Sequence, residues 1–428
     1  MRTSVVINIE EPDLFKQKLL QWSQQYREVV YLDSNDCQQK YSTYDVVVAV
    51  DALTSLKTDY VRAFEDLNIY QQTTKDWLFG YLSYDLKNDI EDLDSSNYDG
   101  LDFPDLFFFQ PKKLFLLKGG RLEVTYLKMC EDDFEVDYDN IISSSIDSNS
   151  DLSKVNIKQR ISKGLYVDKV RKMLEYIHVG DIYEANFCME FYAEDVVINP
   201  LDKYKKLNAV SEPPFAVFFK NHKQYLLSAS PERYLRKEGT KIVSQPIKGT
   251  APRSLGIVED NSIKQELVVN EKERSENIMI VDLVRNDLSK TAKKASVEVE
   301  ELCGVYSFKQ VHHLISTVVS QIKDEFSPTD VIKETFPMGS MTGAPKISAM
   351  KIIEELEETK RGLYSGAVGY FTPGGDFDFN VVIRSILYNE ENKYLSFSVG
   401  SAITAKSDPE KEYEECLLKA RAMRGVLS

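Results

Sequence analysis

One lysine stands between a proline and a glycine in the segment Gln245-Pro246-Ile247-Lys248-Gly249-Thr250. Proline fixes φ and lacks an N–H donor, while glycine permits a backbone geometry or a close ligand approach that other residues do not. The segment therefore predicts that Lys248 lies on a shaped loop. There the amine is either a surface charge or a buried group that takes part in chemistry.

Four glutamates form two pairs with a spacing of three residues, which places each pair on one helix face: Glu273 with Glu276, and Glu412 with Glu415. Such faces are often solvated, but an apolar run follows Glu276 and indicates burial at that end. A buried carboxylate must be paired or bound to a cation, and magnesium prefers oxygen ligands that water or substrate complete. The spacing alone leaves both interpretations open.

Three further features are candidates for binding or proton transfer. The run 336–346 carries two glycines, two hydroxyl side chains and a proline before a predicted helix, so it is either an anion site or an ordinary helix-start turn. Arg384, within an apolar strand, is either a structural ion pair or a carboxylate clamp. His312 and His313 open a strand whose alternation sends their rings to opposite faces, and one of them is a candidate proton carrier or a buried structural histidine.

The elements that must position these residues are predicted helices and tight hairpins. Strands joined by tight turns are antiparallel, so the pattern indicates an α+β fold with large, mostly antiparallel sheets. A long helix is expected from Ser262 to Asp287 and a closing helix from Pro409 to Arg424. Hairpin turns are expected at Gly119-Gly120, Glu238-Gly239 and Pro373-Gly374-Gly375. Neither a G-x-G-x-x-G after a strand nor a Walker loop is present, so nucleotide binding is not indicated.

The chain is expected to divide into three regions. Residues 1–130 form an N-terminal α/β region that packs on the core. Residues 131–154 are acidic and rich in serine, which indicates a linker or mobile loop. Residues 155–428 form the domain that carries the candidate residues.

Composition excludes several classes of function. The 428 residues carry a net charge of -15, which argues against a nucleic-acid surface and against attraction to anionic lipid. Five scattered cysteines suit a reducing compartment and give no metal or disulfide framework. No apolar run has the length of a signal or a membrane helix. We expect a cytoplasmic protein that binds neither nucleic acid nor membrane.

From about Leu165 to the C-terminus, six ordered motifs resemble the chorismate-utilising enzymes, which comprise anthranilate synthase component I, aminodeoxychorismate synthase component I, and the isochorismate and salicylate synthases. The resemblance implies a four-layer α/β/β/α sandwich with orthogonally packed sheets. The motifs are Gly180-Asp181-Ile182-Tyr183, Ser230-Pro231-Glu232-Arg233, Pro246-Ile247-Lys248-Gly249-Thr250, Ile280-Val281-Asp282-Leu283-Val284-Arg285-Asn286-Asp287, the loop 339–346, and Glu412-Tyr413-Glu414-Glu415.

The resemblance is strongest to the aminodeoxychorismate synthase branch, because Lys248 stands where anthranilate synthases carry alanine. It implies that Lys248 attacks carbon 2 of chorismate while Glu232 protonates the hydroxyl that leaves carbon 4. Ammonia then adds at carbon 4, giving 4-amino-4-deoxychorismate for para-aminobenzoate and folate synthesis. An amine nucleophile must be neutral, so burial or a nearby cation is expected to lower the pKa of Lys248.

The same resemblance assigns the metal site and the substrate contacts. It implies Mg²⁺ held by Glu276 and Glu415, with Glu273 and Glu412 acting through water. His313 matches a histidine near the ring. The residues that match the grip on the enolpyruvyl carboxylate of chorismate are Tyr370, Arg384 and the backbone at Gly400. Thr342 and Gly343 lie in the loop that faces the ring carboxylate, and Ser401 is a further expected substrate contact.

Glu184 departs from the family pattern. It stands where the amidotransferase-linked members usually show glutamine and the isochorismate synthases a water-activating lysine, so water is disfavoured as the nucleophile. No cysteine lies in a glycine-rich nucleophile turn, so ammonia is expected from a separate glutaminase subunit or from free ammonium. Two alternatives stay open, an anthranilate synthase component I and a catalytically silent chorismate-binding subunit, the latter favoured by Glu184 alone.

Overall fold

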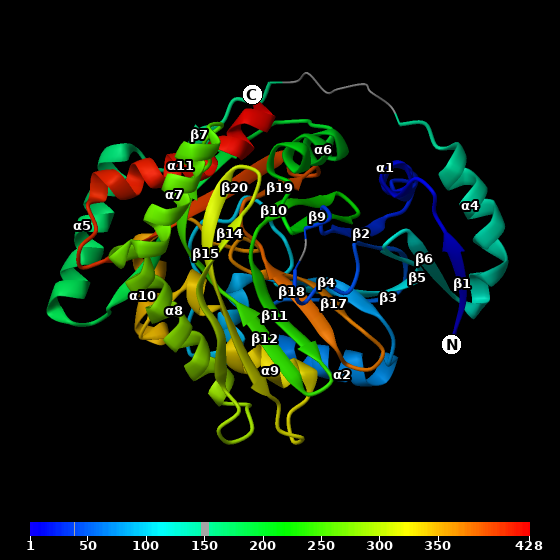
Figure 1. The fold of residues 1–428 in the computed structure, drawn as a ribbon, viewed down its shortest axis with the longest axis horizontal. Coiled ribbons are helices and arrows are strands. Elements are labelled where there is room, and N and C mark those ends of the chain that lie inside the picture. The colour runs from blue at the N-terminus through cyan, green and yellow to red at the C-terminus, as the bar shows by residue number, and fades with distance from the viewer. Residues whose placement is uncertain (38, 147–153) are drawn as a thin grey trace.

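A computed structural model describes residues 1–37, 39–146 and 154–428 as a mixture of helices and antiparallel strands (Figure 1). The elements before residue 147 are β1 (Arg2–Asn8), α1 (Pro12–Ser23), β2 (Glu28–Asp33), β3 (Val46–Thr58), α2 (Ala63–Thr74), β4 (Leu78–Leu82), η1 (Tyr84–Leu86), α3 (Lys87–Ile90), β5 (Leu106–Lys118), β6 (Arg121–Leu127), η2 (Lys128–Asp133) and α4 (Phe134–Ser143).

The second part of the chain repeats the order of a helix followed by strands. Its elements are β7 (Lys158–Gln159), α5 (Lys163–Val179), β8 (Glu184–Ala193), α6 (Pro200–Ser211), β9 (Phe215–Asn221), β10 (Gln224–Ser230), β11 (Arg233–Glu238), β12 (Lys241–Gln245), β13 (Ile247–Pro252), α7 (Ile257–Val269), α8 (Glu271–Ser289), β14 (Glu298–Ser307), β15 (Val311–Gln321), α9 (Pro328–Thr335), η3 (Gly339–Met341), β16 (Gly343–Ala344), α10 (Lys346–Leu356), β17 (Ala367–Phe371), β18 (Phe377–Val381), β19 (Ser385–Asn389), β20 (Tyr394–Thr404) and α11 (Pro409–Leu427).

The strands pair in an antiparallel sense throughout the sheet, as the turn chemistry predicts. The three predicted hairpins form as β5 with β6, β11 with β12, and β17 with β18. Strands from the first and second parts of the chain also join, because β2 pairs with β9 and β4 lies between β5 and β17. A mixed fold with a large antiparallel sheet is thus confirmed, and the four-layer arrangement stays a prediction.

Alternation along the strands builds two separate hydrophobic clusters. Val29 and Tyr31 of β2 belong to one cluster, and Val30 between them belongs to the other. Helices α5, α6 and α11 cover the first cluster, and α2 and α9 cover the second. In Figure 1, α6 and α11 lie toward the top, α5 lies on the left, and α2 and α9 lie toward the bottom. Within the described ranges, no helix combines the length and apolar character needed to cross a membrane.

The glutamate-bearing helices reach the same side of the molecule by packing on strands. Helix α8 packs on β13 and β15, and α11 packs on β20 and α5. In Figure 1 both helices lie on the left, together with α7. The fold therefore brings two pairs of glutamates, which lie far apart in the sequence, toward Lys248. This lysine lies in strand β13 and not on the loop that the sequence predicted.

The predicted long helix is interrupted. The structure has α7 and α8 in its place, and they meet at Asn270, whose φ of -66° and ψ of 108° are not helical. The Asn270 side chain accepts a hydrogen bond from the Glu273 N–H at 3.1 Å. Asparagine is a preferred N-cap, so it starts a new helix at a point where the periodic pattern alone predicts continuation.

The region predicted as a linker contains a helix. Residues 134–143 form α4, whose Phe134, Tyr138 and Ile141 follow the i, i+4, i+7 spacing and pack toward the first hydrophobic cluster. The prediction of a linker relied on the acidic, serine-rich composition and did not take the spacing of these three apolar residues into account. Residues 147–153 of the predicted linker lie outside the described residues.

We predict that Gly80→Ala lowers the free energy of unfolding by about 1 to 3 kcal/mol, because an added Cβ overpacks the sheet. Gly80 pairs with Gly369 of β17, and its Cβ would overlap the Phe107 carbonyl oxygen and approach the Phe108 Cα to 2.7 Å. Urea unfolding followed by circular dichroism measures the change. Gly164→Ala in α5 has open space and is the control, expected to be neutral or stabilising; equal effects of the two changes would contradict the packing argument.

Candidate active site

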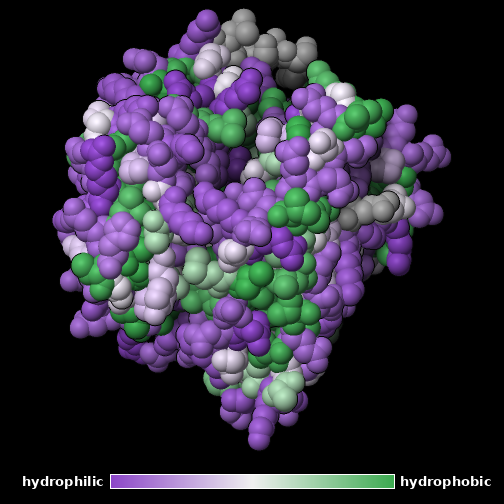
Figure 2. Space-filling model, turned by 60° about the vertical axis from the view of Figure 1, so that its left-hand side comes forward, coloured by the Kyte–Doolittle hydropathy of each residue, from purple (hydrophilic) through white to green (hydrophobic). Residues whose placement is uncertain are grey.

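A cleft of about 1150 Å³ opens beside Lys248. Its walls come from β13, α8, β15, α11, β20 and the loop before α10. Figure 2, turned so that the left side of Figure 1 comes forward, shows a hollow bordered largely by hydrophilic side chains. The volume is sufficient for a small ring with charged substituents, since sites for small molecules usually measure about 300 to 1,000 Å³.

Lys248 lines this cleft with 13% of its side chain exposed, and its Nζ lies 2.9 Å from Glu184 Oε1. Burial acts to lower the pKa of Lys248, but the carboxylates of Glu184, Glu276 and Glu415 outweigh it, so the pKa is raised. This corrects the sequence-based expectation of a lowered pKa. That expectation included burial and left out the neighbouring carboxylates.

Glu232 is 4% exposed and lies on the cleft wall just before β11. Burial raises the pKa of Glu232 to about 7, although hydrogen bonds from Ser340 Oγ and the Ile247 N–H, and the charge of Lys248, act in the other direction. The bond from Ser340 Oγ to Glu232 Oε1 measures 2.7 Å. A carboxylic acid with this pKa keeps its proton in a large fraction of molecules at neutral pH, which suits a general acid.

All four predicted metal-site glutamates line the cleft: Glu273 and Glu276 from α8, and Glu412 and Glu415 from α11. Burial raises the pKa of Glu276 to about 7, and the charge of Glu273 adds to this effect. Burial acts to raise the pKa of Glu415 too, but Lys419, whose Nζ lies 2.6 Å away, outweighs it and the pKa is lowered.

These carboxylates suit a divalent cation that takes other ligands from water and substrate. Among the described residues, no group of three or more His, Cys, Asp or Glu side chains is gathered closely enough to hold a metal ion alone. Magnesium normally uses one or two carboxylates and keeps several waters, so a closed protein cage is not required. A bound divalent cation would relieve the repulsion between the like charges of Glu273 and Glu276, which share one helix face.

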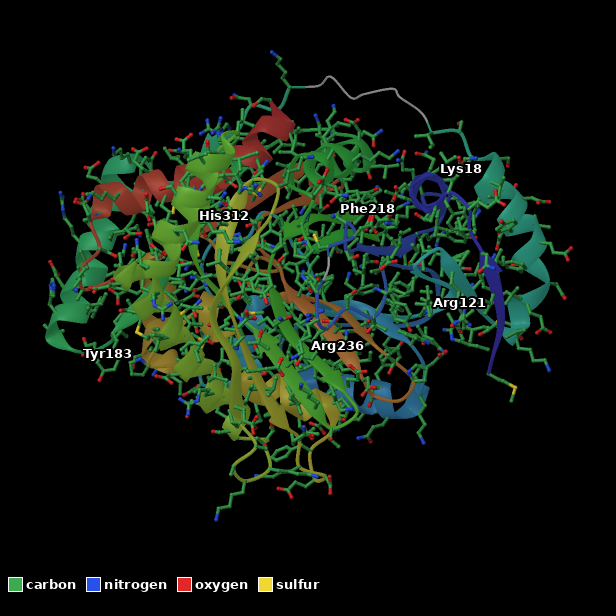
Figure 3. The ribbon with its side chains drawn as sticks, in the orientation of Figure 1. Lys18, Arg121, Tyr183, Phe218, Arg236 and His312 are labelled. Atoms are coloured by element: carbon green, nitrogen blue, oxygen red, sulfur yellow. The ribbon has the colours of Figure 1, made fainter. Side chains whose placement is uncertain are left out.

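His313 also lines the cleft, and the strand sends His312 the other way, as alternation predicts. His313 Nδ1 lies 2.9 Å from Thr250 Oγ1, and burial, with Arg384 nearby, lowers the pKa of His313 to about 3. The imidazole is therefore neutral. His312 contacts Asp260 of α7 at 3.0 Å, and Figure 3 labels it beside that helix.

Arg384 reaches the cleft from the turn before β19, where its φ is +53°. Burial acts to lower the pKa of Arg384, against the effects of Tyr364 and Glu415. In the part of the chain that the structure describes, no carboxylate forms an ion pair with this guanidinium, in contrast to Arg361 with Glu357. Of the two interpretations of Arg384, the carboxylate clamp is favoured.

Tyr370 lies outside the cleft, which corrects its expected position. Its ring packs 5.5 Å from Trp77 and 5.6 Å from Phe79, and it lines a different cavity. The tyrosine of this segment that lines the cleft is Tyr364, which neighbours Arg384. Both tyrosines flank the run Ser365–Gly369, and only the start of β17 at Ala367 tells that Tyr364 lies on the preceding turn.

Of the remaining predicted contacts, Gly400 lines the cleft, whereas Thr342, Gly343 and Ser401 are buried and do not line it. The Gly400 carbonyl oxygen accepts a hydrogen bond from Lys419 Nζ at 2.8 Å. Lys419 also lines the cleft, and the sequence did not predict this cation there. The Ser401 hydroxyl instead meets Tyr166 at 3.1 Å. The Thr342 hydroxyl points to the Met338 carbonyl oxygen, while neighbouring Ser340 and Met341 line the cleft.

Gly343 is held in β16 against β8. A Cβ at this position would overlap the Glu184 carbonyl oxygen and approach the Ala185 Cα to 2.8 Å. Glycine is therefore required for this close approach of two backbones. Substrate contacts of Thr342, Gly343 and Ser401 stay predictions.

The protein family described as chorismate binding enzyme matches residues 22–425. The chain belongs to this family. An anthranilate synthase component I-like protein from Synechocystis is 34% identical over 354 residues, which cover 82% of this chain and 72% of that protein. Aminodeoxychorismate synthase component 1 from Bacillus subtilis is 31% identical over 363 residues, 81% of this chain and 76% of that protein.

A solved structure has the same fold. Anthranilate synthase component I from Streptococcus pneumoniae matches with a TM-score of 0.79 at 24% identity, over 91% of this chain and 93% of that chain. This likeness concerns the fold alone. Together with the family match, the cleft identifies the chain as a chorismate-utilising enzyme.

We predict that Glu232→Gln becomes more stable relative to the unchanged protein as pH rises from 5 to 8. In the unchanged protein, the Glu232 pKa is about 7 in the folded state against 4.5 in the unfolded chain. As pH rises through this range, the unfolded chain loses the proton before the folded protein does, so the stability of the unchanged protein falls. At about 1.4 kcal/mol per pKa unit the relative gain is about 2 to 3 kcal/mol, measured by urea unfolding at both pH values. A constant difference between the proteins would contradict the raised pKa.

Proposed function

We propose that this protein is an aminodeoxychorismate synthase component I, which converts chorismate and ammonia to 4-amino-4-deoxychorismate. The observation that carries the proposal is a lysine, Lys248, that shares the cleft with a buried carboxylic acid, Glu232, whose pKa is raised to about 7. The first is a nucleophile and the second a proton donor, which the replacement of a hydroxyl by an amine requires. The Bacillus subtilis relative carries the same name.

In the proposed reaction the Lys248 amine attacks carbon 2 of chorismate, the ring double bonds shift, and the carbon 4 hydroxyl leaves. Glu232 donates its proton to that hydroxyl, which departs as water. Ammonia then attacks carbon 4, the double bonds return, and the bond from carbon 2 to the lysine breaks. Glu232 takes back a proton from the added nitrogen, so the acid is regenerated for the next turnover.

The neighbouring residues are suited to hold and orient the substrate. The guanidinium of Arg384 pairs with the enolpyruvyl carboxylate, next to Tyr364 and the backbone of Gly400. The neutral His313 imidazole offers a hydrogen bond near the ring. Glu276 and Glu415, with Glu273 and Glu412 through water, would hold Mg²⁺, which supplies Lewis-acid polarisation of the ring carboxylate when bound.

We further propose that a separate glutamine amidotransferase subunit supplies the ammonia and that the product serves para-aminobenzoate and folate synthesis. The name component 1 of the Bacillus subtilis relative supports a multi-component enzyme. All five cysteines are free, which fits a reducing compartment, and we propose the cytoplasm. The anthranilate synthase alternative is kept because the Synechocystis relative carries that name.

We predict that the purified chain, given chorismate, magnesium and ammonium salts, forms 4-amino-4-deoxychorismate, identified by liquid chromatography with mass spectrometry. Adding a glutaminase subunit and glutamine in place of ammonium should sustain the same product. Anthranilate and pyruvate as the main products would refute the proposal in favour of anthranilate synthase. Absence of any turnover with magnesium would favour the silent chorismate-binding subunit.

We predict that Lys248→Ala abolishes the covalent chorismate adduct, since no other amine would occupy that position in the cleft. Peptide mass spectrometry after an acid quench, with ammonia left out so that the adduct accumulates, measures it. Lys237→Ala is the control, because Lys237 is also partly buried and pairs with Asp376 away from the cleft. Full activity of Lys248→Ala would show that the lysine is not the nucleophile.

A further inference from the structure

The contact between Lys248 and Glu184 has no counterpart in the reaction described so far. Glu184 begins β8, its side chain is 1% exposed, and its Oε1 accepts a hydrogen bond from Lys248 Nζ at 2.9 Å. Within the described ranges, the second oxygen, Oε2, is buried and has no hydrogen-bond partner. Asn186 and Cys188, which share the face of β8 with Glu184, both line the cleft.

The backbone holds Glu184 in place from two sides. It pairs with Ala344 of β16 and with Thr404 of β20, and the adjacent Tyr183 N–H donates to the Ala344 carbonyl oxygen at 2.7 Å. Gly343 lies too close to the Glu184 carbonyl oxygen to admit a side chain. The backbone that carries this carboxylate therefore cannot move away from Lys248 without displacing β16.

The lysine must lose a proton before it attacks, because an ammonium group has no lone pair. The charged groups that face it are Glu184 from β8, Glu273 and Glu276 from α8, Glu415 from α11 and Glu232 just before β11. Glu232 must carry its own proton in order to release the hydroxyl. Of the others, Glu184 alone is in hydrogen-bond contact with the amine in the described structure.

The unpartnered oxygen makes Glu184 a suitable acceptor. A buried carboxylate is stabilised as an anion by hydrogen bonds to both oxygens, and this one receives a bond at Oε1 only. Moving one proton from nitrogen to oxygen converts a buried ion pair into two neutral groups, which removes two charges from the cleft interior. The transfer needs no water, since donor and acceptor are already 2.9 Å apart.

We propose that Glu184 is the proton partner of Lys248, a positioning residue that takes the ammonium proton before attack and returns it when the lysine leaves. This inference rests on the proposed function. In the first half, the proton moves from Nζ to Glu184, the lone pair forms the bond to carbon 2, and the hydroxyl leaves with the Glu232 proton. In the second half, the bond from ammonia to carbon 4 forms, the bond to Nζ breaks, and Glu184 reprotonates the free amine.

The decisive variant is Glu184→Gln, which keeps the shape of the side chain and removes its basicity. Adduct formation without ammonia is followed by rapid acid quench and peptide mass spectrometry. We expect its rate to fall by about 10²-fold or more, the usual contribution of general acid and base catalysis. Because Glu184 raises the pKa of Lys248, the pKa of Lys248 should fall in the variant. Competitive acetylation with acetic anhydride across pH measures this pKa.

These two measurements separate the proposal from a simple electrostatic latch. A latch that only keeps the lysine charged predicts that Glu184→Gln frees the amine and speeds adduct formation. A proton partner predicts a slower reaction even though more lysine is neutral. A rate equal to or above that of the unchanged protein would overturn the inference, and it would leave the proposed function intact as long as the unchanged protein still forms 4-amino-4-deoxychorismate.

Glu190→Gln is the matched control, since Glu190 is a buried carboxylate on the same strand that binds Arg160 and Tyr394 away from Lys248. Its adduct rate should equal that of the unchanged protein. If Glu184→Gln does not fold, Glu184→Ala with added sodium formate replaces it. Rescue of adduct formation by formate and not by chloride supports the proton partner, and adduct formation at the normal rate without formate contradicts it.

Discussion

Negative charge is crowded in the cleft, and the chain must place there a substrate that carries carboxylates of its own. Three devices offset this repulsion. Lys248 and Lys419 each contact a glutamate directly. Burial holds a proton on Glu232, whose pKa rises to about 7. Arg384 remains available for an anion, since no carboxylate of the described residues pairs with it.

Much of the site could be predicted from short motifs, because the position of a residue along a strand or helix decides which way its side chain points. Lys248, between Pro246 and Gly249, enters the cleft as expected, and so do Glu232 and His313. The two helix pairs of glutamates converge there because a spacing of three residues aligns side chains on one face. Their metal remains a proposal that rests on donor chemistry.

What sequence reasoning missed depends on three-dimensional neighbours. The contact of Glu184 with Lys248 joins residues from strands that do not pair with each other, so no local pattern encodes it. Tyr364 and Tyr370 flank the same apolar segment, and the choice between them requires knowing where β17 begins. The break at Asn270 is encoded in the capping residue, a signal that the apolar periodicity on both sides concealed.

The position of β4 has a consequence for how the chain is made. Its residues are buried on both faces, one of its edges pairs with nearby β5, and the other pairs with β17, nearly three hundred residues later. Synthesis proceeds at about 5 to 20 residues per second, so an apolar strand with one unpaired edge exists for some tens of seconds on the ribosome. An open apolar edge is a template for aggregation. Expression yield should therefore depend on how well the cell shields this nascent strand until β17 emerges.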